Sequence, residues 1–211
     1  MLANFALAMI SLWMSNGGYS PQSVADAKPP VPYLDKGACP FEGCVYREWV
    51  ANSPVMMRKE RSGTALFAYN VKKGERVTAL RGVVVTIKPG RVLFRESVNL
   101  ASDSGVLHIE PGEPLFLLTY QGEGSTKAWF QGKIYDHLDG ATTFFDSRCE
   151  KDPNRCVGRI IERPVSEWWV QIRNARGQIG WTKETDKFDG KDALGIESGE
   201  INCTTTAQYN S

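Results

Sequence analysis

Aromatic and basic side chains gather in one short stretch of this sequence, from Trp168 to Trp181. A rigid aromatic ring can stack on a sugar or pack against a peptide side chain, and a neighbouring guanidinium can pair with a carboxylate. Arg173 supplies that guanidinium within the stretch. The residue types therefore predict a binding site for an anionic or carboxylate-bearing peptide.

A strand is the element that must position these side chains, because neighbouring strand residues point to opposite faces. The two faces carry Trp168, Val170 and Ile172 on one side and Trp169, Gln171 and Arg173 on the other. This alternation predicts Trp168 in a core and Trp169 on a wetter, ligand-facing side. Most tryptophans are core or half-buried packing, and Trp169 is the expected exception because polar residues share its face.

A tight turn follows this strand, since Gly177 can adopt a positive φ. Ile179 and Trp181 then share one side of the returning strand. Gly180, between them, removes a side chain where a neighbour must pack closely. We predict a shallow ligand groove with two floor residues and two rim residues: Trp169 and Trp181 as the floor, and Arg173 and Tyr135 as the rim.

Residues 169–173 (Trp-Val-Gln-Ile-Arg) and 177–181 (Gly-Gln-Ile-Gly-Trp) resemble the bacterial SH3-like domain. That family typically has Trp-x-x-Val-Arg, a short turn and Gly-x-x-Gly-Trp, and this chain has Ile in place of Val. The resemblance implies a small, strongly bent antiparallel sheet and a non-catalytic binding or targeting module in exported proteins. It also implies that the tryptophan matching Trp169 faces the ligand.

The remaining sequence predicts an all-β fold, because short β-branched and aromatic runs alternate with glycine-containing turns. Residues 71–80 and 109–118 also share the pattern apolar-x-x-Gly-Glu-x-apolar-x-x-Leu. If this echo is not a chance similarity between two turns, the chain holds two SH3-like barrels in tandem; otherwise it holds one elaborated barrel. The expected units are 55–102, degenerate because it lacks its own Gly-x-x-Gly-Trp hairpin, and 105–194, with a polar tail at 195–211.

The N-terminus has the pattern of an export signal over residues 1–27, with an apolar run at 5–14 and Ala-Asp-Ala at 25–27. The run has no basic residue before it, so a retained apolar helix is the alternative. Residues 28–54 are expected to form a proline-containing linker and a cysteine loop. An exported location, periplasmic or secreted, follows from this pattern.

Four of the five cysteines form two close pairs, Cys39 with Cys44 and Cys149 with Cys156. In an oxidising compartment these pairs are expected to close two local disulfide loops. Zinc is the rival hypothesis, but neither pair has C-x2-C spacing and the chain has two histidines. Cys203 remains without an assigned role.

Other features argue against catalysis, cofactors and nucleic acid. The formal net charge is +1, which is no footprint of a nucleic-acid binder. Residues 122–127 resemble a phosphate loop only faintly, and residues 136–139 (Asp-His-Leu-Asp) are expected to form a solvated loop. We therefore expect no catalytic, metal or cofactor site and no transmembrane span in the mature chain, with cell-wall peptide or an envelope protein as partner. The alternative function is a secreted inhibitor or interaction scaffold acting through the disulfide loop at 140–165.

Overall fold

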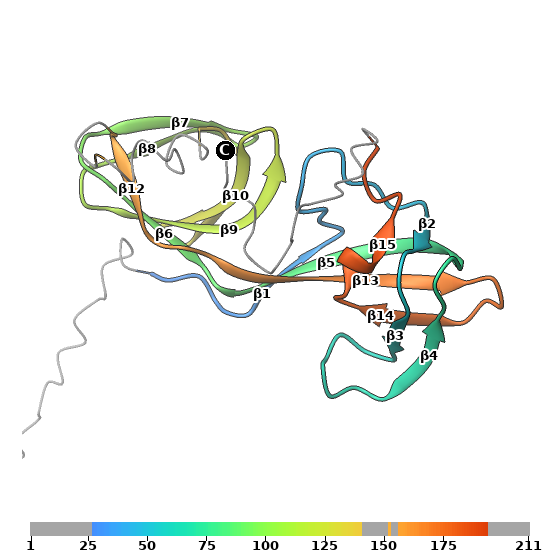
Figure 1. The fold of residues 1–211 in the computed structure, drawn as a ribbon. Coiled ribbons are helices and arrows are strands. Elements are labelled where there is room, and N and C mark those ends of the chain that lie inside the picture. The colour runs from blue at the N-terminus through green and yellow to red at the C-terminus, as the bar shows by residue number, and fades with distance from the viewer. Residues whose placement is uncertain (1–26, 141–151, 153–155, 194–211) are drawn as a thin grey trace, which may run out of the picture.

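A computed structural model describes residues 27–140, 152 and 156–193, and this part of the chain is all-β, as predicted (Figure 1). The strands are β1 (Tyr33–Lys36), β2 (Glu48–Ala51), β3 (Val55–Arg58), β4 (Phe67–Val71), β5 (Arg76–Lys88), β6 (Gly90–Phe94), β7 (Val98–Ser102), β8 (Gly105–Ile109), β9 (Pro114–Gly122), β10 (Ser125–Phe130), β11 (Lys133–Leu138), β12 (Gly158–Glu162), β13 (Val165–Asn174), β14 (Ile179–Thr182) and β15 (Phe188–Asp189). A short 3-10 turn, η4 (Thr185–Lys187), precedes β15. No helix in the described residues is long and apolar enough to cross a membrane.

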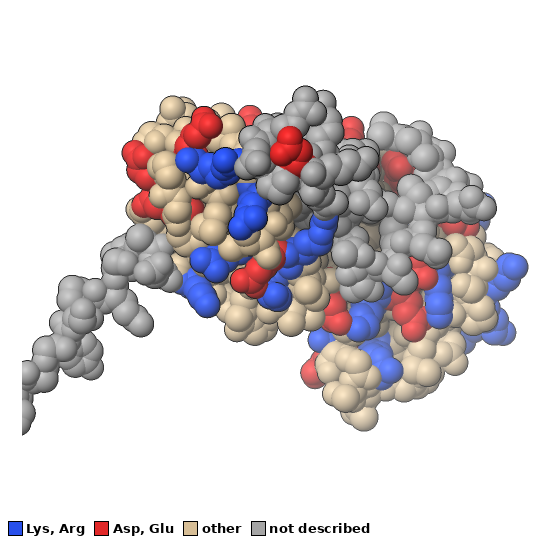
Figure 2. Space-filling view, turned by 60° about the vertical axis from the view of Figure 1, so that its left-hand side comes forward, with Lys and Arg blue, Asp and Glu red and all other residues tan. Residues whose placement is uncertain are grey.

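The strands form two units that lie side by side as adjoining lobes (Figures 1 and 2). One has the sheet order β15-β2-β5-β13-β14-β3-β4, with β1 added on β5. The other has the order β11-β10-β9-β6-β12 and a separate β7–β8 hairpin. Since the second unit, residues 90–162, is inserted between β5 and β13 of the first, we call them the inserted unit and the split unit.

Each unit has its own hydrophobic core. The core of the split unit contains Trp49, Ala51, Val55, Met57, Tyr69, Val71, Val77, Ala79, Val170, Ile172 and Phe188. The core of the inserted unit contains Val92, Phe94, Leu107, Ile109, Leu115, Leu117, Ala128, Phe130 and Leu138. Trp168 packs against the first of these cores, which confirms the position predicted for it from strand alternation.

The two units share one topology. In chain order, the strands of the split unit are β2, the β3–β4 hairpin, β5, β13, β14 and β15. The strands at the same places in the inserted unit are β6, the β7–β8 hairpin, β9, β10, β11 and β12, and equivalent strands have equivalent neighbours in the sheet. Backbone hydrogen bonds from Asp103 and Asp139 also join the β7 hairpin to the β11 edge, where β3 joins β14 in the split unit. The fold is therefore two copies of one small sheet topology, one nested in the other.

The sequence echo marks equivalent turns in these copies. Gly74 and Gly112 have φ of +80° and +86°, which glycine adopts without steric cost. In both turns the glutamate that follows accepts a hydrogen bond on its carboxylate from a backbone N–H three residues earlier: Lys72 to Glu75 and Glu110 to Glu113, each at 2.9 Å. Each turn leads directly into the longest strand of its own unit.

The boundaries expected from the sequence do not coincide with these units. The hairpin of β13 and β14 completes the sheet that contains β2 to β5, so 105–194 is not one unit. The expected unit 55–102 is divided in turn, because β3 to β5 share a sheet with that hairpin whereas β6 and β7 belong to the inserted unit. Residues 28–54 are more than a linker, because they supply β1, β2 and the fully buried Trp49. The reason is that β5 pairs with β13, and even the paired residues nearest in sequence, Lys88 and Val165, are about eighty residues apart. Local periodicity carries no information about contacts at that separation.

The Cys39–Cys44 disulfide predicted from spacing is present. Its loop packs on the split unit, where the Phe41 ring meets the Trp168 ring edge-on at 5.8 Å. Cys156 is also disulfide-bonded. Cys149 lies outside the described residues, as do residues 1–26 of the expected signal at 1–27, most of the alternative active loop at 140–165 and the expected tail at 195–211.

Candidate functional site

The four residues predicted to form a groove fall into both units. Trp169 and Arg173 lie on β13, and Trp181 lies on β14 of the same sheet. Tyr135 lies on β11 of the inserted unit, where it packs against that unit's core. The predicted groove is therefore corrected: Tyr135 is not one of its rim residues, because the chain returns to the split unit only at β13.

Trp169 lies on the face that alternation predicted, opposite Trp168, but it is only 4% exposed. Its cross-strand neighbour Val83 is equally buried. The indole N–H donates to Glu167 Oε2 at 2.9 Å, and Lys183 Nζ, bound to Glu167 Oε1 at 2.6 Å, lies 5.8 Å from the ring centroid. Trp169 is therefore covered packing and not the exposed ligand contact that the sequence suggested.

The same outer face is open farther along the sheet, where five strands bring five side chains into one cross-strand row. The pairs in register are Phe67 with Arg58, Arg58 with Trp181, Trp181 with Gln171, and Gln171 with Arg81. We call this set the Trp181 row. Arg173 and Ile179, themselves a cross-strand pair, lie next to it on the same face.

Trp181 is half-buried and lies between two guanidinium groups. The Arg61 and Arg81 Cζ atoms are 5.5 Å and 5.7 Å from its ring centroid, within the range of a cation–π contact. Arg81 Nε donates to Gln171 Oε1 at 3.0 Å, which fixes the position of this guanidinium. The result is a flat ring presented between two positive charges.

These charges have no acidic partner within the described part of the chain. Arg58 Nη1 donates to the Ala65 carbonyl at 2.9 Å, and no ion pair joins Arg58, Arg61, Arg81 or Arg173 to a described carboxylate. Guanidinium groups without a carboxylate partner can bind one from a ligand, often in bidentate geometry.

Exposed apolar groups flank the row. Phe67 is 53% exposed at one end and Ile179 is 50% exposed beside Trp181. The β3–β4 loop next to Arg58 and Arg61 encloses a hollow of about 320 Å³. Its lining residues are Lys59, Glu60, Ser62, Thr64, Ala65 and Leu66. The surface therefore offers aromatic, apolar and cationic contacts together, as a peptide site requires.

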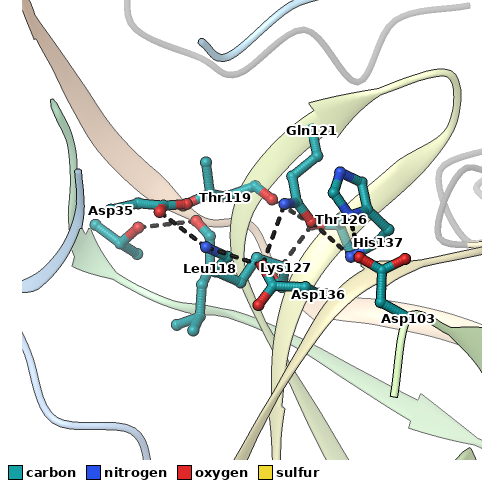
Figure 3. A network of polar contacts seen from close by, with 10 residues as sticks. Asp35, Asp103, Leu118, Thr119, Gln121, Thr126, Lys127, Asp136 and His137 are labelled. Atoms are coloured by element: carbon teal, nitrogen blue, oxygen red, sulfur yellow. Dashed lines mark hydrogen bonds and ion pairs between the residues drawn. The ribbon is translucent and has the colours of Figure 1, made fainter. Parts of the chain in front are cut away.

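The inserted unit uses the equivalent row differently. Counting from the turn glutamates Glu75 and Glu113, Arg81 corresponds to Thr119, and their strand partners are Gln171 and Lys127. Lys127 Nζ lies 2.9 Å from Asp136 Oδ1. The equivalent neighbours in the split unit are Gln171 and Trp181. Lys127 Nζ also lies 2.8 Å from Asp35 Oδ1 on β1, so this row joins the two units (Figure 3).

The Lys127 row is a closed polar network. Gln121 links Asp136 to the His137 backbone N–H, and His137 Nδ1 lies 2.7 Å from Asp103 (Figure 3). Burial acts to lower the pKa of Lys127, but its hydrogen bonds with Asp35 and Asp136 outweigh burial and raise the pKa. The two carboxylates therefore favour the charged form of Lys127 and hold it in this row.

The sequence prediction that residues 136–139 form a solvated loop is wrong for 136–138, which belong to β11: Asp136 pairs with Lys127, and Leu138 is fully buried in the core of the inserted unit. The sequence pattern placed Gln171 on this face but did not identify Arg58, Arg61 or Arg81 as members of the surface. Alternation can place Arg58 outward, but only the strand order brings it to Trp181. Gly180 was predicted correctly, since a Cβ there would lie 2.8 Å from Met57 Cβ.

Within the described residues, no three His, Cys, Asp or Glu side chains are grouped to hold a metal ion. No family model, no curated protein and no solved structure matches this chain.

Proposed function

We propose that this protein is a non-catalytic, SH3-like binding module of the cell envelope that holds a carboxylate-bearing peptide on the Trp181 row. The ligand is a cell-wall peptide or a peptide segment of an envelope protein. Arg61 and Arg81 bind its carboxylates, and Trp181 and Phe67 pack against its apolar groups.

One observation carries this proposal: the row is closed in one unit and open in the other. In the inserted unit, Lys127 is neutralised by Asp35 and Asp136. In the split unit, the equivalent row presents cations and a tryptophan without a described carboxylate. A charged surface left unpaired where the same fold can pair it is typical of a ligand site.

The nested topology supports the SH3-like part of the proposal, because each unit is a small bent antiparallel sheet with its own core. The Cys39–Cys44 disulfide supports an exported location, since disulfides persist in oxidising compartments.

Co-sedimentation of the full chain with purified peptidoglycan tests the function. Trp181→Ala should weaken binding by about thirtyfold or more, as expected for an aromatic hot spot, with little change in melting temperature. Ile134→Ala, at the equivalent of Ile179 in the inserted unit, should bind like the wild type. Trp169→Ala should instead lower stability by about 3–5 kcal/mol, because its ring is buried. Equal sedimentation of wild type and Trp181→Ala, or none by the wild type, would contradict a wall-peptide site on this row.

A further inference from the structure

A second charged surface lies on the inserted unit and beside it, separate from the Trp181 row. Its cations are Lys28, Lys88, Arg91 and Arg159, which we call the basic band. Lys and Arg side chains gather on this face of the inserted unit around an acidic group (Figure 2). Neither the proposed peptide site nor the core accounts for them.

Three of these cations surround one carboxylate. Lys88 Nζ lies 2.9 Å from Glu162 Oε2, whereas Arg91 Nη1 is 3.9 Å from Oε1, beyond hydrogen-bond distance. The pKa of Glu162 is lowered first by its hydrogen bond with Lys88, and the charges of Arg91 and Lys28 lower it further. Glu162 is therefore ionised at neutral pH and offsets only one of the surrounding positive charges.

Strand register places Arg159 on the same face. Phe94, which pairs with Gly158, points into the core, so the next pair, Arg159 and Leu93, points outward. Arg91, two residues before Leu93 on β6, points outward as well. Arg159 is exposed and makes no ion pair with any described residue. The band thus carries four cations against one anion, an excess of three positive charges.

Exposed apolar side chains are interleaved with these cations. Val165, the cross-strand partner of Lys88, is 42% exposed. Val157, which directly precedes β12 and accepts a backbone hydrogen bond from Arg95, is 40% exposed. Mixed basic and apolar contacts suit a lipid interface, where headgroups attract the charges and the apolar groups enter the boundary.

We propose that the basic band docks on an anionic lipid surface. Headgroup phosphates contact Arg91, Arg159 and Lys28, and Val157 and Val165 lie at the interface. A single soluble phosphate would use the cations but not the valines, which is why the geometry favours a membrane surface.

Vesicle co-sedimentation of the full chain tests this proposal, with vesicles of phosphatidylcholine alone or with about one third phosphatidylglycerol. We expect the wild type to prefer the anionic vesicles and to be released by salt. The Arg91→Glu/Arg159→Glu variant should lose that preference by about a hundredfold or more, and Glu162→Gln should strengthen it by about fivefold, given roughly 1 kcal/mol per charge. Arg173→Glu, on the Trp181 row's face, is the matched control and should sediment with vesicles like the wild type.

Three outcomes would overturn the proposal. These are equal binding to both vesicles, an unchanged preference in the folded double variant, or release by inorganic phosphate beyond that by chloride of the same ionic strength, which would indicate a free phosphate site. Thermal melting establishes that the double variant is folded. If it proves unfolded, an unchanged preference in Glu162→Gln would equally overturn the proposal.

Discussion

The split and inserted units show how one sheet topology can be used for two purposes. The equivalent outer rows contain Arg81, Gln171 and Trp181 in the split unit, and Thr119, Lys127 and Asp136 in the inserted unit. In the inserted unit the cation is 13% exposed and fixed by two carboxylates. In the split unit the cations flank a half-buried ring. The difference indicates that the inserted unit is joined to its neighbour through this row, whereas the split unit keeps the row available.

A second contrast concerns the residue that lies next to each row on the same strand. Trp129, paired with Ile134 and Phe116, occupies the position of Arg173, which is paired with Ile179 and Thr78. The Trp129 indole donates to the Ala27 carbonyl at 2.8 Å, so the N-terminal segment contacts this part of the inserted unit. Arg173 is exposed in the split unit. Of the two equivalent rows, the open one thus lies in the unit that carries the motif at 169–181.

The largest effect should come from Lys127→Met. Removing this cation leaves the buried Asp35 carboxylate without its ammonium, which should cost about 3–5 kcal/mol in free energy of unfolding. Gln171→Met, the equivalent change in the open row, should cost less than about 0.5 kcal/mol. Urea denaturation measures both. Adding Asp35→Leu to Lys127→Met should restore most of the loss, and equal costs for the two single variants would break the comparison.

Gly180→Ala should have a smaller effect. The new Cβ would lie 2.8 Å from Met57 Cβ, and repacking should cost about 1–3 kcal/mol. At the equivalent inward position of the inserted unit, Tyr135 packs its ring against the core, so that core has room for a large side chain where the split unit has room only for a glycine. Gly63→Ala is the control, because nothing lies within 4 Å of its Cβ position. If thermal melting shows the same change for both, close packing at Gly180 is not the reason for the glycine.

These contrasts also separate what the sequence could predict from what it could not. Local patterns were sufficient for the all-β class, the Trp168 core position, the Gly180 contact and the Cys39–Cys44 disulfide, because each depends on neighbours in sequence. The burial of Trp169, the exclusion of Tyr135 and the presence of Arg58 and Arg81 depend on strand order. Strand order follows from pairing between β5 and β13 across the insertion, which no short stretch encodes.

The stability of the split unit should depend on pH in the acidic range through Glu167, which binds Lys183 and the buried Trp169 indole. Burial acts to raise the pKa of Glu167, but hydrogen bonds from Lys183 and Trp169 and the charge of Lys183 outweigh it and lower the pKa. Because the folded pKa is below the unfolded one, near 4.3–4.5, the stabilisation is complete above that value and is lost as pH falls through the folded pKa. We expect a contribution of about 1 kcal/mol at neutral pH.

Glu167→Gln should remove this contribution and its acid dependence, measured as the difference in urea stability from the wild type between pH 7 and pH 3. Glu48→Gln is the control, because the Glu48–Arg76 pair is highly exposed and should matter little. If the stability difference from the wild type stays constant with pH, the ionised Glu167 carboxylate does not stabilise the fold through Lys183 and Trp169.

The smallest change in stability should come from Arg173→Ala, which tests whether the open face is used at all. Arg173 is exposed and forms no described ion pair, so its removal should alter the free energy of unfolding by less than about 0.5 kcal/mol. Peptidoglycan binding should nevertheless weaken several-fold, because Arg173 borders the Trp181 row and attracts the same carboxylates. Arg159→Ala, an exposed arginine of the inserted unit, should leave wall binding unchanged. If both variants weaken binding equally, general charge and not the open row of the split unit determines it.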